Sequence, residues 1–207
     1  MQKTVEAWWF SNDKILPHGD GRRIRKGITH KIKGEVVPCK NGLHGSKKIL
    51  DALTYAPGSI IWKVQLSGVV VAHNNDKLAA SERTYLTNGV DTIETLREFS
   101  RKCALDVIHL WNAPDIIVQY LKTGNENLRD AARCAARDAA WNAAWDAAWA
   151  ATRDAARDAA RCAARDAAWA AARDVARCAA RDAAWDAVRK KQNRRLTRMV
   201  NKLIKEK

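Results

Sequence analysis

In the first ninety residues, short runs of hydrophobic residues are separated by polar ones, and this pattern predicts strands and brief helices. Residues 5–10 form an apolar run of strand type, and residues 59–72 are rich in β-branched side chains around a central glycine. The second run predicts two strands or one bulged strand. Helices are predicted from a serine cap over residues 46–55 and from an aspartate cap over residues 76–86. These elements together predict a small α+β domain over residues 1–90.

The following segment, residues 91–125, has apolar side chains at helical spacing and is predicted to be a helical connector. Asp91 and Glu94 form a capping-box pattern at the start of its first helix. A second helix is predicted to begin near Pro114 and to end at Gly124, because glycine is common just after a helix C-terminus.

Residues 126–188 contain an Ala-rich array of fifteen four-residue units, each opened by Arg or Trp and most closed by Ala-Ala. The array has neither Gly nor Pro, and Ala is the strongest helix former, so it predicts a long helix in an otherwise all-α second region. A four-residue period follows the i±4 ridge of an α-helix, which favours right-handed or steeply crossed packing over a heptad zipper.

Large indole side chains recur in this array and would be poorly placed in water on a solitary helix. We expect the array to self-associate. The alternatives are that it folds back into a helical bundle or that it is a rigid, solvated spacer helix. The tryptophans predicted to mediate oligomerisation are Trp141, Trp145, Trp149, Trp169 and Trp185.

The formal net charge of +14 is concentrated in two segments. Residues 14–48 and residues 189–207 each carry a net charge of +8, while the rest of the chain is nearly neutral. Such basic segments favour a polyanionic partner, nucleic acid or nucleotide, although they could also serve only to keep an Ala-rich chain in solution. The side chains predicted to contact phosphate are Arg22, Arg23, Arg25, Lys26, Lys47, Lys48, Arg194, Arg195 and Arg198.

The C-terminal segment, residues 189–207, is predicted to be a basic amphipathic helix. Its apolar stripe favours docking on the protein itself, and binding to a membrane surface, nucleic acid or a partner groove are the alternatives. The side chains of that stripe are Leu196, Met199, Val200, Leu203 and Ile204.

Other patterns bear on compartment and chemistry. Five cysteines without a CxxC pair indicate reduced thiols rather than disulfides or a metal site. Neither a secretory leader nor an apolar run long enough for a membrane span is visible, so we expect a cytoplasmic protein. The phosphate-loop, zinc-protease and serine-hydrolase motifs are absent from the sequence.

The segment GLHGSKKILDALTYA, followed by IIWKVQLSG, resembles the central stretch of the ADP-ribosyltransferase-like fold. The resemblance implies an NAD-like nucleotide held by His30 and His44. It further implies that Tyr55 stacks on the nicotinamide ring and that Glu82 stabilises the cationic sugar centre. The alternative for the histidines is an ordinary place in turns or the core.

Over nearly its whole length the chain resembles a family of bacteriophage and bacterial proteins. PCKNGLHGS, DALTYAPGSIIWKVQLSG and CALDVIHLWNAPDIIVQYLKTG, ahead of the Ala-rich array, carry this resemblance. It implies an accessory role in a phage or mobile element within a bacterial host cell, and it assigns no activity. The function expected from the sequence is therefore an interaction protein that self-associates and engages a polyanion. The alternative is an NAD-binding or nucleotide-binding enzyme.

Overall fold

The computed structural model of the chain describes residues 4–16, 21–139, 142 and 167–206, with side chains in the last range from residue 185 onward. The chain divides into two compact units. Residues 1–97 and 191–207 form the first unit, and residues 98–190 form the second. The first unit combines an antiparallel sheet with helices, so the predicted α+β class is confirmed for this part of the chain.

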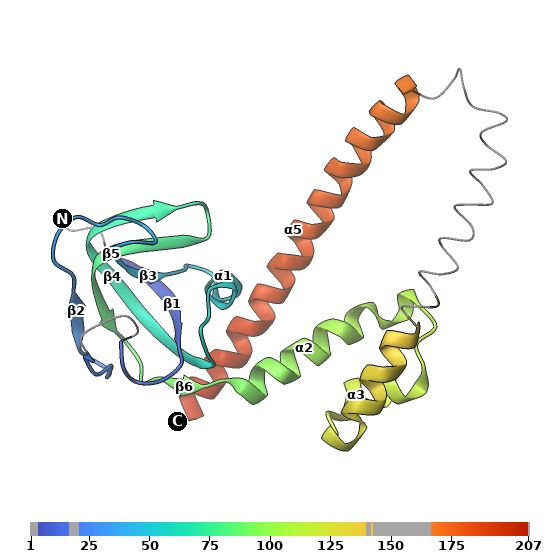
Figure 1. The fold of residues 1–207 in the computed structure, drawn as a ribbon, viewed down its shortest axis with the longest axis horizontal. Coiled ribbons are helices and arrows are strands. Elements are labelled where there is room, and N and C mark those ends of the chain that lie inside the picture. The colour runs from blue at the N-terminus through green and yellow to red at the C-terminus, as the bar shows by residue number, and fades with distance from the viewer. Residues whose placement is uncertain (1–3, 17–20, 140–141, 143–166, 207) are drawn as a thin grey trace. The chain divides into compact units, whose positions relative to one another are not determined.

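A six-stranded antiparallel sheet forms the centre of the first unit (Figure 1). Its main path runs in the order β1, β4, β5, β2, while β3 also pairs with β5 and β6 also pairs with β4. The strands are β1 (Val5–Ser11), β2 (Thr29–Lys31), β3 (Leu43–Gly45), β4 (Ile60–His73), β5 (Lys77–Tyr85) and β6 (Val90–Asp91).

Strand β4 is one continuous strand with a bulge, which confirms one of the two forms predicted for this run. The register with β5 shifts between Ser67 and Val70, and Gly68 between them has a φ of 72°. A Cβ at Gly68 would lie 2.1 Å from the Ser81 hydroxyl oxygen, which accepts a hydrogen bond from the Val69 amide. Glycine is therefore required here both by the left-handed backbone and by the close approach of β5.

The prediction of a helix over residues 76–86 is wrong, because this segment forms β5. Asn74, with a φ of 53°, lies in a tight turn after β4, and the chain returns antiparallel to β4 from Lys77. Alternate residues Arg83 and Tyr85 are buried, and the intervening Thr84 is only half-buried. This two-residue period and the ladder with β4 outweigh the aspartate cap that suggested a helix.

The helix predicted over residues 46–55 is shorter than expected. Helix α1 (Ile49–Thr54) has Lys48 at its N-cap position. Ser46 does not cap it, because its backbone exchanges two hydrogen bonds with Trp8 on β1. Pairing with β1 thus extends the chain up to the helix and fixes the position of the β3–α1 connection.

The main core cluster of the first unit lies against the sheet and contains large side chains from β1, β4 and β5. The Tyr85 ring lies edge-on to Trp9, His30 and Trp62, with centroid separations of 5.3–6.0 Å. The buried members of the cluster are Ala7, Ile24, Trp62, Val64, Leu66, Ala80 and Tyr85.

The C-terminal turns of α5 (Ala167–Glu206) belong to the first unit. Leu196 and Val200 are fully buried, and the Leu50 amide of α1 donates a hydrogen bond of 3.2 Å to the Asn193 side chain. Figure 1 shows these last turns beside α1. The prediction that the apolar stripe docks on the protein itself is therefore confirmed.

Four helical elements lie in sequence between the sheet and the repeat array: α2 (Ile93–Val107), η1 (Ile108–Leu110), α3 (Asp115–Thr123) and η2 (Glu126–Leu128). The Asp91 carboxylate accepts the Ile93 amide at the start of α2, and Gly124 ends α3 in the left-handed conformation with a φ of 67°. Both predicted helix boundaries are confirmed, since a side-chain cap and a C-terminal glycine satisfy the free backbone groups there.

The repeat array is helical in the two parts that the structure describes, residues 129–139 and the portion within α5. Trp185 is 64% exposed. Trp141, Trp145 and Trp149 lie outside the described residues, and so does the side chain of Trp169. Within the described ranges, no helix combines the length and the apolar character needed to cross a membrane.

Candidate functional site

A buried arginine lies at the centre of the sheet. Arg83 on β5 pairs with Leu66 of β4 on one side and His30 of β2 on the other, and it is only 2% exposed. Its Nε and Nη2 groups donate to the Tyr85 hydroxyl at 3.2 and 2.8 Å, and Nη1 donates to the His44 carbonyl at 2.9 Å. The guanidinium group is therefore fixed in position.

Among the residues that the structure describes, this guanidinium has no acidic partner. The ion pairs found there are formed by other lysine and arginine side chains. The guanidinium lies over the Trp9 ring, 3.8 Å from the centroid. Burial lowers the pKa of Arg83, and the adjacent Tyr85 hydroxyl partly opposes that shift. A desolvated cation–π contact contributes about 2 kcal/mol, whereas burial of an ion costs several kcal/mol. An anion bound nearby would offset this cost.

A pocket of about 710 Å³ is open to Arg83. Trp9, Arg22, Lys33 and Lys40 also line it, and none of its described lining residues is acidic. The backbone of its wall is held by the Asn41 side chain, which donates to the carbonyls of Lys33 and Glu35 at 2.9 Å. The pocket is thus a cationic cavity on an ordered loop.

His44 lies at the boundary of this cavity and a second pocket. Its Nε2 atom accepts a hydrogen bond of 3.3 Å from the Cys39 amide. Burial lowers the pKa of His44, and the positive charges of Lys77 and Arg83 and the nearby His73 lower it further. The ring is therefore neutral at pH 7, with its proton on Nδ1.

The second pocket, of about 310 Å³, brings His44 and Tyr55 together with Trp8 and Lys77. The Tyr55 hydroxyl donates to the Asp76 carboxylate at 2.8 Å, and the Lys77 ammonium lies 4.2 Å from the ring centroid. The hydrogen bond to Asp76 is the largest cause of a raised pKa of Tyr55. One face of the tyrosine is thus occupied by a lysine.

The other two residues suggested by the ADP-ribosyltransferase resemblance lie elsewhere. His30 is 4% exposed, and its Nδ1 atom is 3.1 Å from the Tyr85 hydroxyl, as for a core histidine. Glu82 precedes Arg83 in β5 and so points to the opposite face of the sheet, where it forms an ion pair of 2.8 Å with Lys31. The four residues do not meet in one site.

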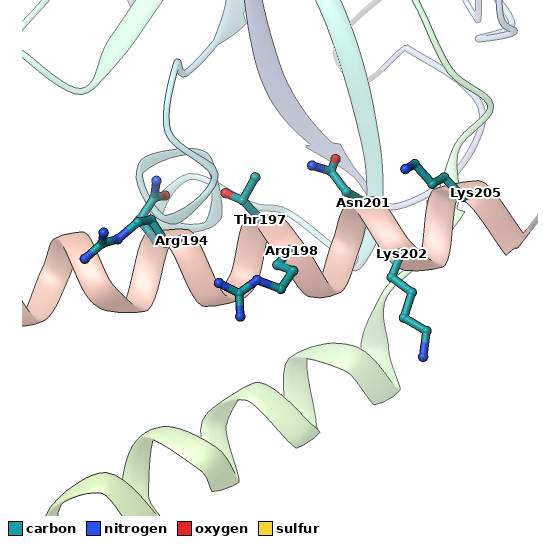
Figure 2. A pocket seen from close by; sticks show the side chains of 7 residues that line it. Arg194, Thr197, Arg198, Asn201, Lys202 and Lys205 are labelled. Atoms are coloured by element: carbon teal, nitrogen blue, oxygen red, sulfur yellow. The ribbon is translucent and has the colours of Figure 1, made fainter.

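A second basic surface runs along the last turns of α5. Arg194 and Arg198 lie about half a helical turn from the buried Leu196, so they project away from the docked face. We call this surface the α5 ridge, and Figure 2 shows its labelled side chains. The ridge flanks a shallow pocket of about 630 Å³ and consists of Arg194, Thr197, Arg198, Asn201, Lys202 and Lys205.

The basic residues predicted from the sequence separate into four groups. Arg22 lines the Arg83 pocket, and Arg194 and Arg198 belong to the α5 ridge. Arg195 is half-buried beside the docked face. The remaining predicted cations are exposed outside both surfaces: Arg23, Arg25, Lys26, Lys47 and Lys48.

Sequence reasoning missed Trp9, Lys33, Lys40 and Arg83 as site residues. The signal for Arg83 was its place in an alternating strand pattern, two residues before Tyr85 on the same face. The prediction of a helix over residues 76–86 concealed that signal. Within the described parts of the chain, no cluster of three His, Cys, Asp or Glu side chains is arranged to hold a metal ion.

Comparison with known families adds one finding. Residues 23–98 match a family model described as a domain of unknown function (DUF7666). The matched segment includes His44 and Arg83 but neither β1 nor α5. No curated protein matches the chain, and no solved structure matches it.

Proposed function

We propose that this chain is an interaction protein that binds nucleic acid through phosphate contacts, as an accessory factor of a phage or mobile element in the cytoplasm of a bacterial host. The observation that carries the proposal is the α5 ridge. Its apolar opposite face is anchored by the buried Leu196 and Val200, so its cations are presented to solvent on a fixed scaffold.

The ridge has the dimensions for several phosphates. Arg194 and Lys205 are eleven residues apart, which corresponds to roughly 17 Å along the helix axis. Arg194, Arg198, Lys202 and Lys205 are all exposed, and Glu206 lies 3.8 Å from the Lys202 ammonium as a weak surface partner. Arginine and lysine on such a surface contact the backbone rather than the base edges, so little sequence preference is expected.

Replacing Arg194, Arg198 and Lys202 together by Gln is expected to weaken nucleic-acid binding and reduce its dependence on salt. Each lost phosphate contact lowers the slope of log K against log salt by about 0.9 on duplex DNA, so the slope should fall by about 2 to 3. Fluorescence anisotropy with labelled DNA and RNA over a salt series measures both quantities.

A matched control removes the same charge from the second unit, through the exposed residues Lys102, Lys122 and Arg137 replaced by Gln. This control should leave the slope nearly unchanged. Absence of binding to DNA and RNA at low salt would contradict the proposal. Equal weakening by the ridge variant and the control would show that only net charge matters, and the ridge would lose its role.

We also propose that the repeat array mediates self-association. Support comes from the Ala-Ala pattern of the sequence and from Trp185, an array indole that is 64% exposed in the single chain. Burial of such a ring against a second copy removes a large apolar surface from water. Because the period follows the i±4 ridge, the helices are expected to cross steeply.

Light scattering on the full chain after size exclusion is expected to give a mass above that of one chain at micromolar concentration. Replacing Trp169 and Trp185 by Ala should shift the equilibrium towards monomer, since a buried indole contributes about 3–5 kcal/mol. Trp111→Ala, at a 43% exposed tryptophan outside the array, is the control and should leave the mass unchanged. A monomeric wild-type chain at every concentration would refute self-association.

A further inference from the structure

We propose that the pocket lined by Arg83 binds a compact phosphate-bearing anion, such as the pyrophosphate group of a small molecule. This site goes beyond the proposed function, because the α5 ridge suits an extended polyanion and lies on a different element. The cations that line the pocket are Arg22, Lys31, Lys33, Lys40 and Arg83.

Arg83 retains hydrogen-bonding capacity that a ligand can use. A guanidinium has five N–H donors, and the three hydrogen bonds to Tyr85 and His44 leave two without a protein acceptor in the described structure. The side chain is 2% exposed and lines the cavity. Planar N–H groups of this kind match the oxygen spacing of phosphate, which makes arginine a preferred phosphate ligand.

The charge around the cavity also favours an anion. Arg22, Lys33, Lys40 and Arg83 are all cationic, and so is the remaining lysine of the lining, Lys31, which forms an ion pair with Glu82. Since no described lining residue is acidic, the local potential is positive and favours an anion of more than one charge. A phosphate ester or pyrophosphate fits this requirement better than a single carboxylate does.

The cavity is ordered before any ligand binds. Two partners and the Trp9 ring hold Arg83, and Asn41 holds the loop that carries Lys33 and Lys40. Little conformational entropy is then lost on binding, apart from that of the lysine side chains. The volume of about 710 Å³ lies within the range of small-molecule sites, so the cavity can hold a phosphate group and the molecule attached to it.

Isothermal titration of the full chain with sodium pyrophosphate tests this site. Saturable binding with one site per chain is expected. Replacing Lys33 and Lys40 by Gln should weaken the affinity for pyrophosphate about tenfold or more. Each charge-assisted hydrogen bond contributes a factor of about ten to the affinity. Both lysines are exposed, so this variant should fold normally. Arg83→Lys, which retains the charge and loses the planar fork, should also weaken binding.

Two control variants separate this site from general electrostatics and from the ridge. Lys47→Gln with Lys48→Gln removes the same charge from exposed positions outside the pocket lining and should leave pyrophosphate affinity within about twofold. The triple ridge variant should also retain it. If the chain binds pyrophosphate but not nucleic acid, the proposed nucleic-acid function is refuted and the pocket assignment stands. Absence of saturable pyrophosphate binding, or equal weakening by both double variants, would overturn the pocket assignment.

A further arm identifies the source of the phosphate. Oligonucleotides with a 5′-phosphate and with a 5′-hydroxyl are compared on the full chain and on the Lys33, Lys40 variant. A preference for the 5′-phosphate that this variant abolishes would assign the pocket to a nucleic-acid end. Equal affinity for the two oligonucleotides, with pyrophosphate binding retained, would assign it to a free small molecule.

Discussion

Replacing Leu196 by Ala is expected to destabilise the first unit by about 2–5 kcal/mol, although this residue is more than a hundred positions from the sheet in sequence. Leu196 is fully buried, and the same stretch of α5 places Val200 in the core and Asn193 against α1. The loss combines the transfer free energy of the removed carbons with the cavity they leave. Urea unfolding of the full chain, followed by tryptophan fluorescence and far-ultraviolet circular dichroism, measures it.

The matched control for this change is Arg198→Ala, on the exposed face of the same helical turn. It should alter the free energy of unfolding by no more than about 0.5 kcal/mol, as is usual for a surface substitution. If both variants had the same small effect, the C-terminal turns would not be part of the folded unit. The fixed scaffold that the α5 ridge requires would then be lost as well.

The docking of α5 has a consequence for the organisation of the chain. The segment matched by the domain family, residues 23–98, ends within α2, whereas the compact unit also includes β1 and residues 191–207. Residues 98–190, which include the repeat array, therefore lie in sequence between two parts of one folded unit. A change in the number of repeat units would therefore leave both sequence segments of the first unit, residues 1–97 and 191–207, intact.

Elements specified by local signals could be predicted from the sequence. The β-branched run of β4 with its glycine, the Asp91 cap of α2 and Gly124 after α3 each act within a few residues of their own position. The apolar stripe of α5 was equally readable, because its helical period leaves one face to bury. In these cases local chemistry and the final fold agree.

Elements specified by distant partners could not be predicted in this way. Strands β2 and β3 have three residues each and are strands only because β5 pairs with both. The assignment of β5 as a helix placed Arg83 on a helix surface, where an arginine is ordinary. Only the sheet shows that Arg83 shares a face with Tyr85 and lies over Trp9, which comes from the other end of the domain.

Replacing Tyr85 by Phe is expected to destabilise the first unit by roughly 3 kcal/mol, a large effect for the loss of a single oxygen atom. That oxygen accepts two N–H groups of Arg83 and lies 3.1 Å from His30 Nδ1. Without it, a buried cation loses two of its three hydrogen bonds, and the ring itself still fills its place in the core. The result expected from denaturant unfolding is a lower midpoint with an unchanged slope.

A double-mutant cycle tests the cause of this effect. Its second mutation, Arg83→Met, removes the charge and retains much of the side-chain length. If the cost of Tyr85→Phe arises from the stranded guanidinium, it should shrink when the guanidinium is absent, with a coupling of about 0.5–3 kcal/mol. Additive effects within about 0.5 kcal/mol would mean that the hydroxyl stabilises the core independently of Arg83. The guanidinium would then not depend on Tyr85 for its position, and the claim that Arg83 is ordered in the pocket before a ligand binds would lose its main support.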